Sequence, residues 1–489
     1  MKELRKLAGQ TAIYGFSSVI GRLLNYLLVP LYTRVFSTAE YGEVTAMYAY
    51  VAFLVVLLTY GLETAFFRYS SAEKNNKNIY STCLFSLVFT SSIFIFICSI
   101  YSESIARLID FNTNPEYVVW FAWIIGLDAI SSISFAKLRN QNKAKRFAII
   151  KLINIFLNIG LNLFFLIYCP FAIKNQLTSL EFLVQYYDPN LGIGYIFLSN
   201  LIATCLTLIL LLPEMIFSSW KIDFMLLKKM LIFSAPLLIA GLAGIANETI
   251  DRILIVYLLP ENIALSEVGI YGALYKISIL MTLFIQAFRF AADPFFFSKT
   301  DDVNAKIIYA RVMNYFVAIS ALIFLSIMVY YDLVIKFVGD DFQDPRGKVV
   351  VPLLLLANLC LGIYYNLSIW FKLTNKTIFG AYISIFGAVV TISLNFILIP
   401  FTGFVGAAYA TLLCYLSMVV LCYILGKKHY PIPYDIKLIS KYLFLMASLY
   451  CCFYFIDLGM LFNNLYLLLF IAVIIFLEKP KKILNSNKI

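Results

Sequence analysis

The chain carries little charge and almost no histidine. Of its 489 residues only 13% are Asp, Glu, Lys or Arg, and one is histidine. A soluble globular protein has about 25% charged residues, so a soluble fold is excluded. One histidine and nine cysteines without a CxxC pair do not supply the ligands of a zinc site. The sequence also lacks a glycine-rich phosphate loop, so ATP-driven transport would require another subunit.

Apolar sequence makes up most of the chain. Hydrophobic residues account for 62% of it, and the mean hydropathy is +0.87. Taking about 20 apolar residues as one membrane span predicts an all-α polytopic membrane protein with about 14 transmembrane helices. The predicted spans cover residues 12–33, 44–66, 81–101, 117–136, 147–169, 191–212, 230–259, 268–290, 307–330, 350–371, 378–399, 404–425, 438–457 and 462–477.

The basic residues predict the orientation of these spans. If the N-terminus is inside, most of the 38 lysines and arginines fall in short inner segments. Positive residues mark the cytoplasmic side, so both termini are predicted to be cytoplasmic. The net charge of +11 is then spread over short loops that face anionic lipid headgroups, and nucleic-acid binding is not expected. No cleavable signal peptide is expected either, because MKELRKL leads into a full-length span.

The sequence contains an internal repeat. A shift of 227 positions aligns STAEYGEVTAMYAYV with ALSEVGIYGALYKIS and places Gly42 over Gly269. Further on, LNLFFLI at position 161 matches LNFILIP at position 394. We therefore predict two six-helix lobes, residues 1–213 and 228–426, followed by a terminal helix pair at 437–477. Each lobe has an even number of spans, so the repeat is parallel, and two such lobes meeting in a V would leave a cavity at the membrane midplane.

Residues 231–260 form a membrane-length apolar run that contains Glu248, Asp251 and Arg252. A charge at the centre of a bilayer costs about 2.5 to 3.5 kcal/mol, so charged groups there normally face a bundle interior or a watery cavity. Glu248 and Arg252 are four residues apart and can pair along one face of a helix. This run is the first candidate for function.

Other spans carry charges as well. Arg22 lies near the middle of the first span, Glu63 lies toward the inner end of the second, and Lys276 lies in the eighth. Arg289 and Asp293, also in the eighth span, are four residues apart and are expected to pair. Guanidinium groups bind phosphate oxygens bidentately, which makes these arginines candidate ligands for a phosphate. The alternative is structural: Arg22 would pair with another helix, and Arg252 would only neutralise Glu248 or Asp251.

Two further features each leave two readings open. Asp128, a lone acid in the fourth span, could make an interhelical hydrogen bond or take part in ion coupling. Residues 171–190 have almost no counterpart in the second lobe and could be a solvated outer loop or a contact for sugars. The inner loop KLRNQNKAKR, which begins at Lys137, is interpreted as a topology signal.

Several runs together resemble a known family. They are LLVPLYTRVFSTAEYGEVTAMYAY, APLLIAGLAGIANETIDRILIVYLLP and LNFILIPFTGFVGAAYATLLCY, in this order. They resemble the Wzx-type polysaccharide (O-antigen or capsule) flippases of the multidrug/oligosaccharidyl-lipid/polysaccharide exporter superfamily, and the resemblance covers essentially the whole chain. It implies a MATE-like core of two six-helix lobes with two extra helices. It also implies movement of undecaprenyl-pyrophosphate-linked oligosaccharide from the cytoplasmic to the periplasmic leaflet of the bacterial inner membrane by alternating access.

The resemblance also implies roles for the charged residues. The pyrophosphate-binding candidates are Arg22, Arg252, Lys276 and Arg289, and the candidates for coupling to H⁺ or Na⁺ are Glu63, Glu248, Asp251 and Asp293. No catalytic residue, metal or other cofactor is expected. The partners would be membrane lipids, the lipid-linked oligosaccharide and a polysaccharide polymerase or export machinery, with the chain itself a monomer. The alternatives are a MATE-like multidrug or cation antiporter and a membrane-embedded polysaccharide polymerase.

Overall fold

The computed structural model describes residues 20–72, 78–109, 114–176, 184–185, 187–216, 221–300, 302–456, 459 and 463–478, without the side chains of Asp293, Pro294, Ser298 and Glu478. Within these ranges there are helices and no strands. The helices are α2 Val29–Val35, α3 Thr38–Thr59, α4 Leu62–Ala72, α5 Asn78–Ile100, α6 Ser102–Leu108, α7 Glu116–Asn140, α8 Ala144–Leu163, α9 Cys169–Lys174, α11 Gly194–Ile216, α12 Phe224–Leu258, α13 Glu261–Ser298, α14 Ala305–Val329, α15 Tyr331–Val334, α16 Gly347–Leu367, α17 Ile369–Leu373, α18 Ile378–Thr402, α19 Phe404–His429, α20 Ile436–Phe455 and α21 Asn464–Glu478.

Twelve of these helical segments are long and apolar enough to cross a membrane, within the described part of the chain. They coincide with the second to the thirteenth predicted spans. The fourteenth corresponds to a shorter apolar helix, Asn464–Leu477. Residues 12–19 of the first predicted span lie outside the described residues, and the remainder forms a helix at 20–26 followed by α2. The predicted all-α polytopic membrane fold is confirmed.

The surface has the polarity expected of a protein in lipid. Large apolar side chains such as Phe401 (85% exposed) and Phe444 (75%) point outward, whereas Asn162 and Asn395 are fully buried. In water the apolar exposure would be unfavourable, because each buried methylene group contributes about 0.8 kcal/mol. In a bilayer the same groups contact acyl chains, and the polar groups find partners inside the protein.

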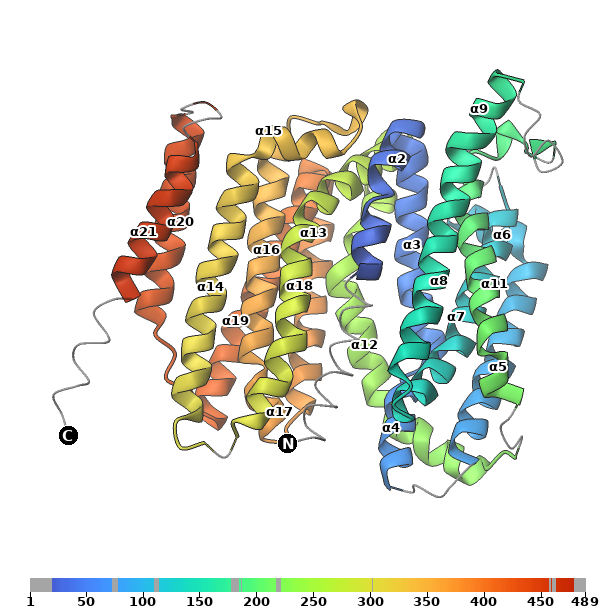
Figure 1. Cartoon of the computed structure of the whole chain (residues 1–489), viewed down its shortest axis with the longest axis horizontal. Coiled ribbons are helices and arrows are strands. Elements are labelled where there is room, and N and C mark those ends of the chain that lie inside the picture. Colours follow the sequence, from blue (N-terminus) through green and yellow to red (C-terminus); the bar gives the residue numbers. More distant parts are fainter. Residues whose placement is uncertain are drawn as a thin grey trace. The chain divides into compact units, whose positions relative to one another are not determined.

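The helices form two compact units, residues 1–272 and 273–489, which divide within α13. In unit 1, α7 is the central helix and packs against α3, α5 and α11, while α8 packs on α11 and α12 on α3 (Figure 1). In unit 2, α19 packs on α16 and α18, and α14 packs on α16 and α20 (Figure 1). The boundary therefore falls later in the chain than the linker expected at 214–227, and the lobe limits drawn from the sequence stay a prediction.

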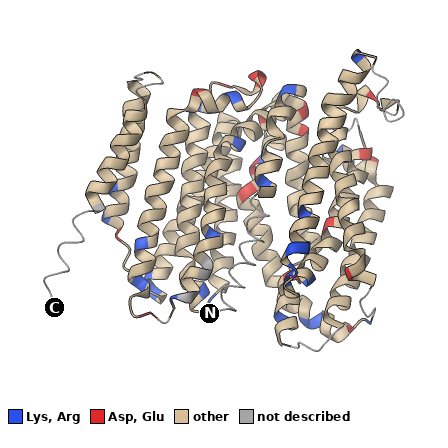
Figure 2. Ribbon diagram, viewed as in Figure 1, with Lys and Arg blue, Asp and Glu red and all other residues tan. Residues whose placement is uncertain are grey.

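In four helices of unit 2 the charged residues lie at the ends. The middles of α14, α16, α18 and α19 carry no Lys, Arg, Asp or Glu (Figure 2). Basic residues lie where α14 begins and α19 ends, and acidic residues follow the other end of α14 (Figure 2). In that acidic segment Arg346 donates a hydrogen bond of 2.8 Å to Asp344, and this lowers the pKa of the Asp344 carboxyl.

The start of α13 packs against α3 at two glycines of the repeat. A Cβ added to Gly42 would lie 1.8 Å from the carbonyl oxygen of Leu265, and one added to Gly269 would lie 1.9 Å from that of Thr38. The 227-residue shift maps Gly42 onto Gly269 and Thr38 onto Leu265. Each contact is thus the counterpart of the other, as a two-fold axis between the two helices requires. Only glycine allows the two backbones to approach this closely.

Candidate functional site in the charged helix

The charges of α12 are organised around Asp251. Its Oδ1 accepts hydrogen bonds from the backbone N–H of Arg252 (2.8 Å) and from Arg252 Nη1 (3.2 Å). Its Oδ2 accepts a hydrogen bond of 2.5 Å from the hydroxyl of Tyr271 on α13. Asp251 is only 3% exposed and Arg252 only 9%. Both carboxylate oxygens of Asp251 therefore accept hydrogen bonds, and the carboxylate pairs with a buried cation, Arg252.

The spacing of Glu248 and Arg252 predicts an ion pair, but the structure has a different contact. Arg252 Nη1 donates to the backbone oxygen of Glu248, at 2.6 Å, and pairs with the carboxylate of Asp251. The side chain of Glu248 is exposed and makes no ion pair or hydrogen bond with the described residues. The contact of Arg252 thus matches the structural alternative, in which this arginine neutralises an acid. The carboxylate of Glu248 is accessible.

Arg22 lies in a different setting. It is exposed on the helix at residues 20–26, and it has no ion pair or hydrogen bond within the described ranges. The neighbouring Gly21 lies against Ile155 of α8, where an added Cβ would be 2.7 Å from the Ile155 Cδ1 atom. The exposed guanidinium of Arg22 is therefore accessible to a ligand.

Two acids at one end of unit 1 are engaged by basic residues. Glu63 of α4, a candidate for ion coupling, forms an ion pair with Arg139 at the end of α7. Glu214, near the end of α11, was not singled out from the sequence, yet it is buried and surrounded by cations. Arg146 Nη1 lies 3.0 Å from its carboxylate, with Lys143 and Lys137 Nζ at 3.7 and 3.9 Å.

The basic loop that follows α7 therefore has a second role. Its sequence marks the topology. In addition, its ion pairs with Glu214 hold the connection between α7 and α8 against the end of α11. Three cations around one buried carboxylate compensate the cost of removing that carboxylate from water. No sequence periodicity indicates this contact, because its partners lie far apart along the chain.

Two basic candidates lie along α13 in unit 2. Lys276 is partly buried, and the Arg289 guanidinium lies 3.9 Å from the ring centre of Tyr365 on α16. The side chain of Asp293, the expected partner of Arg289, lies outside the described residues. Thirteen helical positions separate Lys276 from Arg289, which is about 20 Å along the axis. One pyrophosphate cannot contact both at once.

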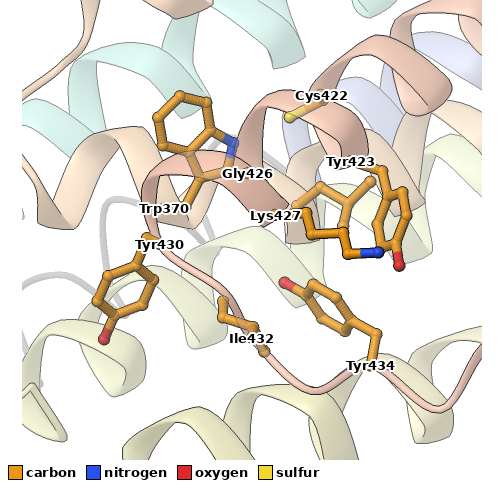
Figure 3. A pocket seen from close by; sticks show the side chains of 9 residues that line it. Trp370, Cys422, Tyr423, Gly426, Lys427, Tyr430, Ile432 and Tyr434 are labelled. Atoms are coloured by element: carbon orange, nitrogen blue, oxygen red, sulfur yellow. The ribbon is translucent and has the colours of Figure 1, made fainter.

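One cavity in unit 2 is too small for a substrate. It is lined by Trp370 of α17, by Cys422 and Gly426 of α19 and by Tyr434 (Figure 3). Its volume is about 10 Å³, room for roughly one water molecule. Burial raises the pKa of the Tyr434 hydroxyl well above its ordinary value. Within the described ranges, no group of three or more His, Cys, Asp and Glu could hold a metal ion.

The outer segment 171–190 is described only in part, because residues 177–183 and 186 lie outside the described residues. Tyr187 of the described part stacks on Tyr195 of α11, with 4.9 Å between ring centres, and Tyr195 also stacks on Phe165, at 4.6 Å. The Tyr195 hydroxyl accepts a hydrogen bond of 2.8 Å from the backbone N–H of Asp188. A contact between this segment and sugars stays a prediction.

Comparison with solved structures identifies the fold. The Lipid II flippase MurJ, in an inward closed conformation, superposes with a TM-score of 0.73 at 14% identity, over 94% of this chain and 96% of that one. An inward-facing MATE multidrug transporter of the MOP superfamily gives 0.63 at 12% identity, over 88% and 96%. A mutant of the Vibrio cholerae MATE transporter VcmN gives 0.58 at 12% identity, over 87% and 96%. The fold is thus the one shared by MurJ and the MATE transporters.

No curated protein sequence matches the chain. The model of one protein family, described as polysaccharide biosynthesis protein, matches residues 7–300. This match covers more than half of the chain and includes all of unit 1 from residue 7 onward, with the charged helix α12. The chain belongs to the polysaccharide biosynthesis protein family, and it has the fold that MurJ and the MATE transporters share.

Proposed function

We propose that the protein is a flippase that moves undecaprenyl-pyrophosphate-linked oligosaccharide from the cytoplasmic to the periplasmic leaflet, for O-antigen or capsule biosynthesis. The observation that carries the proposal is the family match over residues 7–300. The fold adds support, because a lipid II flippase has the same architecture. MATE transporters share this fold as well, so a multidrug or cation antiporter is the competing function.

Arg22 is the first candidate for the pyrophosphate. Its guanidinium is exposed and has no partner within the described ranges, so it can bind an anion without breaking a contact made there. Arg252 is bonded to Asp251 in the structure. To bind the pyrophosphate, it would have to break this contact or contact both anions at once. Lys276 and Arg289 lie too far apart on α13 to bind one pyrophosphate together, and they would act at different stages of the transport cycle.

Ion coupling is assigned first to Glu248. Of the four acidic candidates, Glu63 is paired with Arg139 and Asp251 with Arg252, whereas the Glu248 carboxylate is exposed. Asp293 stays the fourth candidate. Moving one charge through 100 mV releases about 2.3 kcal/mol, enough to bias a two-state cycle roughly fiftyfold. The coupled ion would be H⁺ or Na⁺.

The remaining assignments follow from the same proposal. The protein would act as a transporter and not as an enzyme, in the bacterial inner membrane and as a monomer. The basic ends of its helices would face the cytoplasm, with both termini. The delivered glycan lipid would pass to a polysaccharide polymerase or export machinery in the periplasm.

The direct test is transport by the purified protein in lipid vesicles. Undecaprenyl pyrophosphate carrying a fluorescent oligosaccharide is placed in the inner leaflet, and its arrival in the outer leaflet is measured with a membrane-impermeant quencher. We expect faster arrival than in protein-free vesicles, and slower arrival when both the H⁺ and the Na⁺ gradients are collapsed. Equal rates with and without protein, together with efflux of a cationic dye, would establish the antiporter instead.

In the same vesicles, replacement of Arg22 with alanine should slow glycan-lipid transport by roughly 10- to 100-fold, because a hydrogen bond to a charged group contributes about 1.5 to 3 kcal/mol. Lysine at this position should restore part of the transport rate, because it keeps the positive charge but cannot donate two parallel hydrogen bonds to a phosphate as a guanidinium does. The matched control is Arg34→Ala, which removes an exposed arginine on α2 that donates to the backbone oxygen of Pro30. A wild-type rate in Arg22→Ala at equal protein amount would remove Arg22 from the site.

A further inference from the structure

Asp128 is an accessible carboxylate in the middle of α7. Its side chain is exposed, although Ile124, Ile125 and Ser131, one turn away on the same helix, are buried. Residues three and four positions apart share a face of a helix, so Asp128 lies on a face of α7 that otherwise packs against the protein. Asp128 has no hydrogen bond, and no ion pair within 4 Å, with the described residues. The interhelical hydrogen bond considered from the sequence is therefore absent among these residues.

Polar groups from two other helices interact with this carboxylate. Lys151 of α8 and Tyr48 of α3 both interact electrostatically with Asp128. Lys151 is exposed, and its Nζ lies 4.3 Å from the ring centre of Phe135, without an ion pair within the described ranges. The Tyr48 hydroxyl accepts a hydrogen bond of 3.0 Å from the amide of Asn200 on α11. An acid and a base thus lie near each other without forming a direct ion pair.

A row of polar residues continues from Lys151 along α8. Asn154, Asn158 and Asn162 follow at intervals of three and four residues, so they share one face of the helix. Two of them are fixed by neighbouring helices. The Asn154 amide donates to Thr207 of α11, at 2.9 Å, and Asn162 accepts from the hydroxyl of Tyr32 on α2, at 2.9 Å.

The second copy of the repeat lacks part of this row. The matching LN motifs pair Asn162 with Asn395 of α18, and the Nδ2 atoms of both residues donate to the side-chain oxygen of the residue four positions earlier, at 3.2 Å in each case. The same alignment places Ser384 and Gly387 at the positions of Lys151 and Asn154. The second copy therefore keeps the hydrogen bond of Asn395 to the residue four positions earlier. It lacks the side chains that correspond to Lys151 and Asn154.

The chemistry of these groups favours a neutral ligand. Asp128 would repel an anion and Lys151 would repel a cation, while together they carry no net charge. Carboxylate, ammonium, phenol and amide groups offer both acceptors and donors, which suits a ligand rich in hydroxyl groups. Resting on the proposed function, we propose that Asp128, Lys151 and the Asn154–Asn158 face of α8 bind the sugar hydroxyls of the lipid-linked oligosaccharide, apart from the pyrophosphate.

The test compares two substrates in vesicles: undecaprenyl pyrophosphate without sugar, and the same lipid carrying a neutral tetrasaccharide. The double variant Asp128→Asn/Lys151→Gln should move the tetrasaccharide lipid at least tenfold more slowly than wild type. It should move the sugar-free lipid within twofold of wild type. The control is Phe156→Leu, an exposed position on α8 outside the polar row, which should leave both rates unchanged. Equal losses for the two lipids, or no loss for either, would overturn the inference.

A second measurement separates this inference from the proposed function. Soluble tetrasaccharide should raise the Tm of the purified wild-type protein and not that of the double variant, whether or not the protein transports lipid. If wild type fails to move the tetrasaccharide lipid but its Tm still rises selectively, the proposed function is wrong and the sugar site stands. If wild type transports the lipid and soluble sugar shifts both proteins equally, the site is wrong and the function stands. The two substitutions preserve side-chain size, and an unchanged Tm without sugar verifies folding.

Discussion

Replacing Asp251 with alanine should lower the free energy of unfolding by about 3 to 5 kcal/mol, the usual effect of leaving a buried charge without its partner. Arg252 is 9% exposed and loses the carboxylate with which it pairs. The hydroxyl of Tyr271, a fully buried residue, loses this acceptor as well. The measurement is the Tm and the denaturant midpoint of the purified protein in detergent.

Two further variants separate the contributions at this site. Tyr271→Phe removes one donor to Asp251 and should cost about 1 to 3 kcal/mol, because the buried Oδ2 atom loses this hydrogen bond. Glu248→Ala is the control on the same helix, and should change stability by less than about 0.5 kcal/mol, because its side chain is exposed and unbonded within the described structure. Equal Tm values for Asp251→Ala and Glu248→Ala would contradict the described cluster.

Alanine at Gly42 should destabilise the protein by about 3 kcal/mol or more, at the upper end of the cost of overpacking. The new Cβ would lie 1.8 Å from the carbonyl oxygen of Leu265. A backbone atom cannot rotate away, so α3 and α13 would have to separate by roughly 1.5 Å to reach an ordinary contact distance. The loss of Tm would be accompanied by a loss of transport, since the helices no longer meet.

The control for this substitution is another helical glycine. Gly160 of α8 has no atom within 4 Å of an added Cβ, so Gly160→Ala should stabilise the helix by up to about 1 kcal/mol. Gly269→Ala, at the counterpart position, should repeat the effect of Gly42→Ala, because its Cβ would lie 1.9 Å from the oxygen of Thr38. If Gly42→Ala and Gly160→Ala unfold at the same temperature, the close packing of α3 and α13 is refuted.

Hydropathy predicted the spans because a membrane imposes length and polarity on each helix separately. It did not predict where a span bends. The segment expected at 44–66 forms α3 and α4, interrupted at Tyr60 and Gly61, whose φ angles are +34° and +73°. Such a break depends on the backbone conformation of two residues, and it leaves the average hydropathy of the segment unchanged.

Side-chain partners were harder to predict than spans, because most of them come from other helices. Helical spacing favoured Glu248 as the partner of Arg252, but the structure pairs Arg252 with Asp251, which Tyr271 also holds. The contacts of Glu214 with the loop after α7 join segments with no shared periodicity. For the same reason the sequence marked Asp128 as a lone acid but gave no sign of Lys151 or Tyr48 beside it.

The glycine contact between α3 and α13 has an evolutionary consequence. The 227-residue shift maps Thr38 onto Leu265 and Gly42 onto Gly269, so the two helices contact each other through corresponding positions of the repeat. A half-length ancestor with one copy of these positions could already have associated with a second identical chain. Gene fusion would then have joined two subunits along an existing dimer interface, after which each copy was free to acquire its own charges.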